Sequence, residues 1–245
     1  MRYFIAAIRF LTVLPLPGNY GASERDFAGS APFFPLVGLL MGMLAAGVAF
    51  FTSMAFPPLV SAAVVLVLLM IFSGGLHMEG VSDTADGFLS SRPKEKILEI
   101  MKDSRAGPMG IIVVTSVLIL KFSALSSVLE SDLWRVAFLM PLAGRCAIII
   151  HMSLLKYARP SGLGSSICRK RPWITAIWST LLLAAAGWQL FGAAGLLTVG
   201  ICLTAVLLLA LYFYRRLGGA TGDTFGAACE IAETMTALSL AVMFW

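Results

Sequence analysis

Seven apolar runs, each about as long as a membrane is thick, constrain the fold of this chain most. The hydrocarbon core of a bilayer is about 30 Å thick, and a helix needs about 20 apolar residues to cross it. The predicted spans are residues 33–56, 58–76, 108–129, 133–155, 173–191, 193–214 and 226–245. The last is the weakest prediction because it contains Glu230 and Glu233. We therefore expect an all-α, polytopic membrane bundle of about seven transmembrane helices.

The charge content supports a membrane protein. Only 13% of the 245 residues are charged, whereas a soluble domain carries about a quarter. The net charge of +5 does not lead us to expect a nucleic acid partner, because Lys and Arg also hold membrane loops on the cytoplasmic side. We expect one integral membrane domain over residues 1–245, with an interfacial or cytoplasmic segment over about 1–32.

The distribution of basic residues predicts the orientation. If the N-terminus is cytoplasmic, loops 77–107, 156–172 and 215–225 are cytoplasmic as well. That side then holds Arg2, Arg9, Arg25, Arg92, Lys94, Lys96, Lys102, Arg105, Lys156, Arg159, Arg169, Lys170, Arg171, Arg215 and Arg216. The opposite side has only Arg135, while Lys121 and Arg145 lie within predicted spans. This asymmetry places the long 77–107 segment in the cytoplasm, as the expected active-site element.

Acidic residues at or near the span ends indicate a metal site. Carboxylates at a membrane span need a compensating partner. Two sets have helical spacing that puts each set on one face: Glu79, Asp83 and Asp86, and then Asp223, Glu230 and Glu233. Facing each other, they would form a cage of oxygen ligands suited to Mg²⁺. The predicted metal ligands are Glu79, Asp83, Asp86, Asp103, Asp223 and Glu230. In the alternative reading these acids form a solvated loop, with Asp83 and Asp103 as helix caps.

Basic and polar residues near these acids are candidates for phosphate binding. Ser104 and Arg105 precede Pro108, which suits the first turn of a helix whose N-terminus would favour an anion. Arg145 lies inside a predicted span, where an Arg is a functional candidate by default, with a structural ion pair as the alternative. Arg159 lies in a loop rich in Gly and Pro. His77, two residues before Glu79, is a candidate general base.

Several motifs together resemble the cobalamin synthase (adenosylcobinamide-GDP ribazoletransferase) family, over nearly the whole chain. They include FLTVLPLP from Phe10, FPLVG from Phe34, HMEG from His77, DTADG from Asp83, IMKDSR from Ile100, YARP from Tyr157 and GGATGD from Gly218. Val81-Ser82 departs from the Leu-Ala expected of the family, and Pro108 follows Gly107. Neither difference falls on a proposed ligand.

The resemblance implies the reaction and its setting. Adenosylcobinamide-GDP and α-ribazole, or α-ribazole 5′-phosphate, would give adenosylcobalamin, or its phosphate, and GMP, with Mg²⁺ as cofactor. The expected location is the cytoplasmic (inner) membrane of a prokaryote, with the active site facing the cytoplasm. Catalytic roles would fall to His77, Asp83, Asp86 and Asp223, and substrate binding to Ser104, Arg105, Arg145 and Arg159. The sequence does not identify the general base, and it leaves a homo-oligomer open.

Two other functions fit parts of the pattern. A CDP-alcohol phosphotransferase would share the membrane chemistry, but the second half of that family's motif does not follow Gly87. A transporter would use Lys121, Arg145, Glu230 and Glu233 to line a pathway. Against a transporter, the sequence shows no convincing internal repeat of the kind that transporters commonly have.

Overall fold

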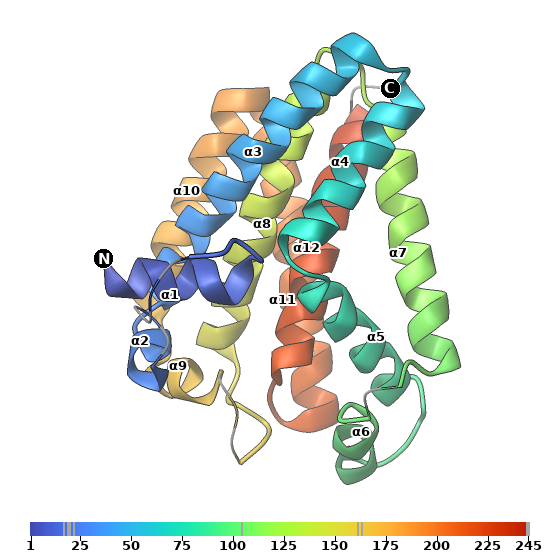
Figure 1. The fold of residues 1–245 in the computed structure, drawn as a ribbon. Coiled ribbons are helices and arrows are strands. Elements are labelled where there is room, and N and C mark those ends of the chain that lie inside the picture. Colours follow the sequence, from blue (N-terminus) through green and yellow to red (C-terminus); the bar gives the residue numbers. More distant parts are fainter. Residues whose placement is uncertain are drawn as a thin grey trace.

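The computed structural model describes residues 1–16, 18, 21, 23–103, 105–160, 162 and 164–243. Most of these residues are helical, and no β-strand is found among them. The helices are α1 (Arg2–Leu11), α2 (Glu24–Ala28), a 3₁₀ turn (Ala31–Phe33), α3 (Phe34–Ala55), α4 (Pro58–Phe72), α5 (Leu76–Phe88), α6 (Lys94–Ile100), α7 (Pro108–Ser127), α8 (Leu133–Leu154), α9 (Ser165–Lys170), α10 (Trp173–Phe191), α11 (Ala193–Leu217) and α12 (Gly222–Met243). Figure 1 shows the long helices side by side in one bundle.

The structure confirms the predicted polytopic membrane bundle. Among the described residues, six helices are long and apolar enough to cross a membrane: Ala31–Ala55, Pro108–Ser127, Leu133–Leu154, Trp173–Phe191, Ala193–Leu217 and Gly222–Met243. A seventh crossing is formed only if the bent pair α4 and α5 is counted as one span. The acidic last helix begins at Gly222, four residues earlier than predicted, and so includes Asp223.

The predicted span 58–76 is wrong at its end, because the helix stops at Phe72. Gly74 and Gly75 follow with φ of +60° and +74°, a left-handed conformation that ends a helix and that glycine adopts without strain. The chain then turns by 86° into α5. With 13 residues, α5 is too short to cross a bilayer alone.

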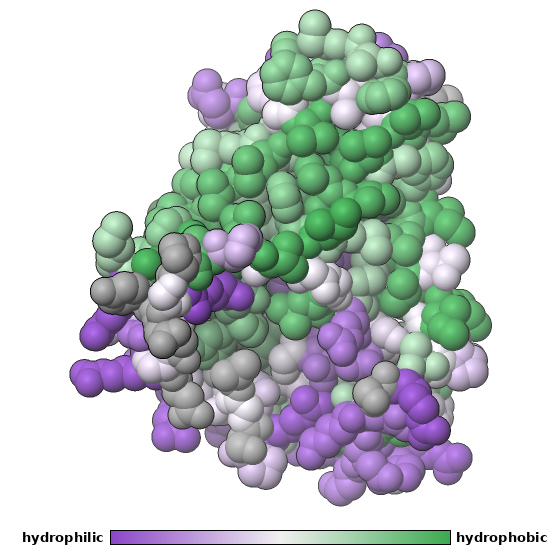
Figure 2. Space-filling model, in the orientation of Figure 1, coloured by the Kyte–Doolittle hydropathy of each residue, from purple (hydrophilic) through white to green (hydrophobic). Residues whose placement is uncertain are grey.

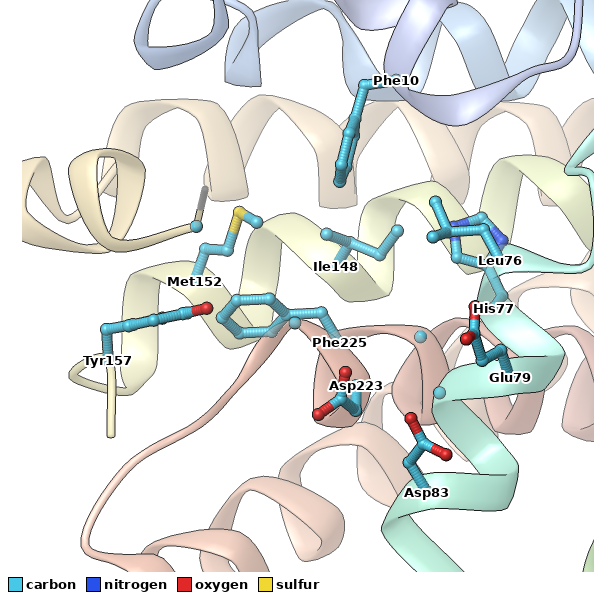
Figure 3. Close-up of a pocket in the computed structure, with 14 residues that line it drawn as sticks. Phe10, Leu76, His77, Glu79, Asp83, Ile148, Met152, Tyr157, Asp223 and Phe225 are labelled. Carbon is cyan, nitrogen blue, oxygen red and sulfur yellow. The ribbon is translucent and has the colours of Figure 1, made fainter. Parts of the chain in front are cut away.

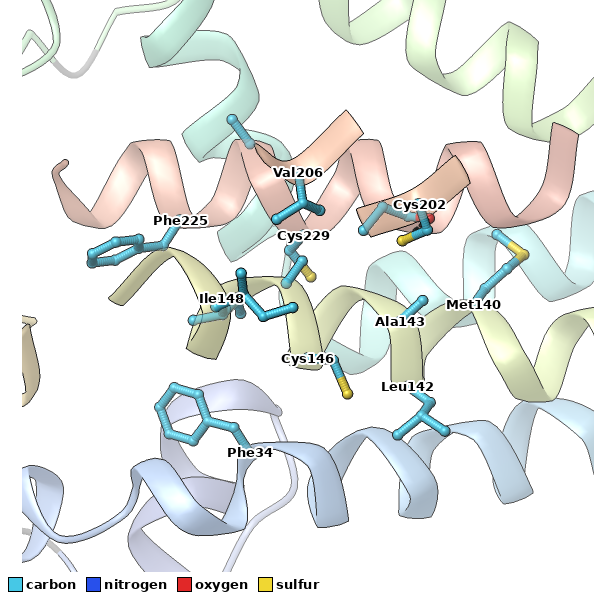
Figure 4. Packing of buried hydrophobic residues seen from close by; sticks show 14 of the residues in the cluster. Phe34, Met140, Leu142, Ala143, Cys146, Ile148, Cys202, Val206, Phe225 and Cys229 are labelled. Carbon is cyan, nitrogen blue, oxygen red and sulfur yellow. Dashed lines mark hydrogen bonds between the residues drawn. The ribbon is translucent and has the colours of Figure 1, made fainter. Parts of the chain in front are cut away.

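Helices α8 and α12 form the centre of the bundle. The most apolar stretches of α8 and α12 are 83% and 78% buried, against 28% for α7 and α10. Buried apolar side chains from α3, α8, α11 and α12 pack together in this core (Figure 4). Close packing against α3 depends on small residues: a β-carbon on Gly38 would stand 2.9 Å from the Pro141 carbonyl oxygen of α8. Gly38 therefore allows the backbone of α3 to lie close to that of α8.

The outer helices present apolar side chains outward. Exposed large residues include Phe51 and Met54 on α3, Ile119 on α7, Leu181 on α10 and Leu208 on α11. Figure 2 shows apolar surface over α3 and α4 and polar side chains gathered around α5 and α6. That distribution is expected of a bundle surrounded by lipid, with one polar end in water.

Candidate active site

A cavity of about 270 Å³ lies where α5, α8 and α12 meet. Its acidic side is formed by Glu79 and Asp83 of α5 and Asp223 of α12 (Figure 3). The structure thus brings Asp83 and Asp223, 140 residues apart in sequence, to one cavity, but only part of each predicted acidic set meets there. The opposite side is apolar and includes Phe10, Ile148 and Met152.

Close contact between two glycine-bearing helices brings Asp83 and Asp223 to one cavity. A β-carbon on Gly80 would stand 2.6 Å from the Asp223 carbonyl oxygen and 3.2 Å from the Gly226 α-carbon. Small residues let helix backbones approach in this way. Gly80 and Gly226 thus both lie at the contact between α5 and α12.

The first turn of α12 is fixed by its own cap and by a distant loop. Thr221 and Thr224 exchange hydrogen bonds, with Thr221 N donating to Thr224 Oγ1 at 2.8 Å and Thr224 N donating to Thr221 Oγ1 at 3.3 Å, a reciprocal N-terminal cap. Arg159 Nη2 donates to Asp223 Oδ2 at 2.7 Å. The Ala158 N–H donates to the Ala220 carbonyl at 2.8 Å, which holds the Arg159 loop beside α12. Arg159 therefore orients the Asp223 carboxylate.

The crowding of carboxylates favours a cation between them. The pKa of Asp83 is raised to about 6, first because burial penalises its charged form and then because Asp223, Glu79 and Asp86 repel it. Among the described residues, the carboxylates of Glu79 and Asp83 have no hydrogen bond or ion pair. Their oxygens are therefore free to bind an ion or a substrate.

His77 adds an unsatisfied polar group to the same cavity. Its side chain is buried, and neither ring nitrogen has a hydrogen-bond partner among the described residues. Burying a polar group without a partner is costly, so such a group calls for an explanation. His77 is among the residues that line the cavity (Figure 3).

A second, more open groove lies on the other side of α5. It has a volume of about 360 Å³ and is formed with α7, including Ser82, Gly110 and Thr115. Glu79 and Asp83 line this groove as well as the first cavity. The two α5 carboxylates are thus accessible from both sides of their helix.

Asp86 has a different environment from Asp83. Its carboxylate accepts hydrogen bonds from the backbone N–H groups of Gly107, at 2.7 Å, and Gly110, at 2.8 Å. These are the free amides at the start of α7, where the sequence predicted a phosphate site. Asp86, and not Asp83 or Asp103, therefore caps a helix, and it does not line the cavity shared by Asp83 and Asp223.

Asp103 and Arg105 pair with each other at the surface. Arg105 Nε and Nη2 donate to the two carboxylate oxygens of Asp103 at 3.1 and 2.8 Å. These hydrogen bonds lower the pKa of Asp103 to about 2. Neither residue is among those that line the cavity. Ser104, predicted to bind substrate, lies outside the described residues.

Arg145 and Glu230 belong to a buried ion network inside the bundle. Lys121 Nζ of α7 lies 2.5 Å from Glu230 Oε2 and 2.7 Å from Glu233 Oε2 of α12. Arg145 of α8 pairs with Glu233 as well. Two positive and two negative side chains neutralise each other there. The structural ion pair, one of the two alternatives for Arg145, is therefore present, and Glu230 lies apart from the Asp83 cavity.

The structure does not assemble the predicted six-residue metal cage. Within the described part of the chain, no three His, Cys, Asp or Glu side chains lie close enough to hold an ion. The pair Asp83 and Asp223, with Glu79 beside them, still suits Mg²⁺. Mg²⁺ is usually bound through one or two carboxylates, water and substrate phosphates.

Three comparisons relate the chain to known proteins. The family model described as Cobalamin-5-phosphate synthase matches residues 3–241. A Desulforamulus reducens protein named adenosylcobinamide-GDP ribazoletransferase is 41% identical over 93% of this chain and 91% of its own. Relatives with the same name from Clostridium acetobutylicum (36% identical; 100% of this chain, 98% of its own) and Geotalea daltonii (32%; 98% and 97%) also match. No solved structure matches.

Proposed function

The chain belongs to the cobalamin-5-phosphate synthase family, and on that basis we propose that it is an adenosylcobinamide-GDP ribazoletransferase. It joins adenosylcobinamide-GDP to α-ribazole, or to α-ribazole 5′-phosphate, and releases GMP. The products are adenosylcobalamin or its 5′-phosphate. A ribose hydroxyl attacks the phosphoryl group attached to the cobinamide, and the bond from that phosphorus to GMP breaks.

The shared cavity of Asp83 and Asp223 is the observation that supports this proposal most. Phosphoryl transfer brings several negative oxygens together, so it depends on positioning and on charge neutralisation. Three carboxylates in one cavity would repel a pyrophosphate unless a cation lies between them. The acidic side therefore fits a phosphate-bearing substrate only as part of a metal site.

We propose Mg²⁺ as the cofactor, held by Asp83 and Asp223, with water and substrate phosphates as its remaining ligands. Glu79 adds negative charge to the same cavity. When bound, Mg²⁺ would neutralise the pyrophosphate and the departing phosphate. Arg159 keeps the Asp223 carboxylate turned toward the cavity through its 2.7 Å hydrogen bond. This ligand set leaves out Asp86, Asp103 and Glu230, because none of the three lines the cavity.

We propose that either His77 or one of the cavity carboxylates accepts the proton of the attacking hydroxyl. His77 fits this role by its position. Its ring nitrogens are buried and unpartnered, and the residue lines the cavity that holds Asp83 and Asp223. A neutral imidazole has one nitrogen that can accept the proton of the attacking hydroxyl.

We further propose that the protein lies in the cytoplasmic (inner) membrane of a prokaryote with this cavity on the cytoplasmic side. The basic loops follow the positive-inside rule in that orientation. Helix α5, which carries Glu79 and Asp83, packs against α6, and α6 carries the exposed Lys94 and Lys96.

The transporter alternative loses its main support. It was motivated by charged residues inside predicted spans, and those residues pair with one another in the described structure. None of Lys121, Arg145, Glu230 and Glu233 lines the cavity.

The direct test measures GMP release by the purified protein. GMP should form only when adenosylcobinamide-GDP, an acceptor and Mg²⁺ are all present, and α-ribazole and its 5′-phosphate should be offered separately. GMP formed equally without either acceptor would indicate hydrolysis. Movement of substrate across sealed vesicles without product would indicate transport.

A further inference from the structure

The candidate active-site cavity has two chemically different sides. Glu79, Asp83 and Asp223 form one, as described above. The other consists of five apolar side chains, from Phe10, Leu76, Ile148, Met152 and Phe225. Figure 3 shows Phe10, Met152, Ile148 and Phe225 around one part of the space and the acidic groups at another. A ligand for this cavity therefore needs an apolar part joined directly to a polar part.

The apolar side is held in place by the packing around it. Ile148, Met152 and Phe225 are buried in the bundle, with side chains 3% exposed or less. The Phe10 ring is fixed by Phe27, with ring centroids 4.7 Å apart. A surface whose side chains are already ordered costs little further entropy when it binds a rigid ring.

The size of the cavity limits what it can hold. Its volume of about 270 Å³ lies just below the usual range for small-molecule sites, which begins at about 300 Å³. A corrin macrocycle is too large for it. A single planar ring with a sugar attached is a better match in size.

Polarity distinguishes between the two bases in the proposed reaction. Guanine carries donors and acceptors around its edge, and burying them unpaired against Phe and Met side chains would be costly. The dimethylbenzimidazole of α-ribazole has no N–H donor and carries two methyl groups, so it loses little by leaving water. Its ribose, joined to the ring, would then face the carboxylate side.

From these observations we infer that the apolar side of the cavity, formed by Phe10, Leu76, Ile148, Met152 and Phe225, binds the benzimidazole ring of the acceptor and so determines the choice of base. This inference rests on the proposed function and adds a specificity site to it. The pyrophosphate of the donor would then reach Glu79, Asp83 and Asp223 without contacting this apolar surface.

The variants for the test are at the more accessible edge of the cavity. Leu76 is 38% exposed, so Leu76→Ala should not prevent folding, and Phe10→Leu keeps an apolar side chain. The matched controls are Leu59→Ala and Phe50→Leu, whose side chains are 60% and 50% exposed on the outer surface of α4 and α3. The acceptors are α-ribazole and the riboside of unmethylated benzimidazole.

The wild-type protein should lose about tenfold or more in kcat/KM when the acceptor lacks both methyl groups, the usual effect of removing groups from a hydrophobic pocket. Leu76→Ala and Phe10→Leu should raise the KM for α-ribazole about tenfold and reduce the penalty for the unmethylated acceptor. The KM for adenosylcobinamide-GDP, kcat and inhibition by GMP should stay near wild-type values, as should every parameter of the controls.

Two results would overturn the assignment. One is an increase in the KM for the donor or weaker inhibition by GMP, with the acceptor KM unchanged, which would place the donor or its guanine against this surface. The other is no change in any parameter in both variants. Failure of the proposed function itself would look different, because the wild-type protein would then release no GMP with any acceptor.

Discussion

The backbone of α5 at Gly80 lies directly against the backbone of α12 at Asp223, where a β-carbon on Gly80 would stand 2.6 Å from the Asp223 carbonyl oxygen. This contact brings Asp83, one turn further along α5, to the same cavity as Asp223. The glycine is therefore part of what defines the site, although it has no chemical group of its own.

Replacing Gly80 with Ala should reduce turnover by roughly tenfold to a hundredfold, because separating the helices by even about 1 Å misplaces the reacting groups. The measurement is GMP release by the purified variant. Gly47→Ala is the matched control, since a β-carbon there meets nothing within 4 Å. Equal activity of the two variants would show that the contact does not set the catalytic geometry.

The buried ion network should matter for stability. Lys121→Met leaves Glu230 without its partner and should cost about 3–5 kcal/mol, the range for breaking a buried ion pair. Adding Glu230→Gln should restore part of that loss, because Glu233 keeps Arg145. The measurement is the fraction of detergent-solubilised protein that stays folded after heating. If Glu230→Gln alone altered the Mg²⁺ requirement without affecting stability, Glu230 would be a ligand instead.

Asp86→Ala should act on the fold more than on the chemistry. It removes the acceptor for the Gly107 and Gly110 N–H groups and should cost about 1–3 kcal/mol of stability. Turnover at low temperature should fall less than for Asp83→Asn. Thermal denaturation and GMP release measured on the same preparations separate the two effects. A stable but inactive Asp86→Ala protein would indicate that Asp86 is a metal ligand, as the sequence predicted.

The orientation can be tested by labelling cysteines in intact cells. The four native cysteines are buried, so they should give little background. Ser131→Cys, on the short α7–α8 connection, should react with a membrane-impermeant thiol reagent from outside. Lys96→Cys, on α6, should react only after the cells are opened. The reverse pattern would place the cavity on the outer side of the membrane.

The sequence predicted the spans well because membrane crossing has a simple physical requirement. From apolar length alone, the predicted span 173–191 has the same ends as the observed helix α10. The predicted span 133–155 ends one residue after the observed helix α8. The break after Phe72 was missed because the apolar run continues past it to Leu76. Gly74-Gly75 was the available signal, since two consecutive glycines favour a turn.

The candidate site was predicted only in part, because residues on one helix face do not all reach one place. A helix rises about 1.5 Å per residue. Asp86 therefore lies roughly 9 Å along α5 from Gly80, and Glu230 roughly 10 Å along α12 from Asp223. At those positions they meet the start of α7 and Lys121. Helical spacing contains no information about those neighbours, which come from distant parts of the chain.

The apolar half of the cavity was not predicted at all. In the sequence, the segments around Phe10 and Phe225 have the pattern of an interfacial helix and of a packed helix. Only the folded structure shows that both side chains line the same cavity as Asp83. Buried aromatic residues are common in any core, so their types alone do not indicate a binding surface.

The central claim is that Asp83 and Asp223 jointly hold the metal at which transfer occurs. Its most direct test is a Mg²⁺ titration of GMP release by purified wild-type, Asp83→Asn and Asp223→Asn proteins, with exposed Glu95→Gln as the control. Wild type and control should require Mg²⁺ and lose activity in a chelator, and each Asn variant should lose at least about 100-fold in turnover while staying folded. Near-normal turnover by folded Asp83→Asn in Mg²⁺, or by the wild-type protein in the chelator, would contradict the claim.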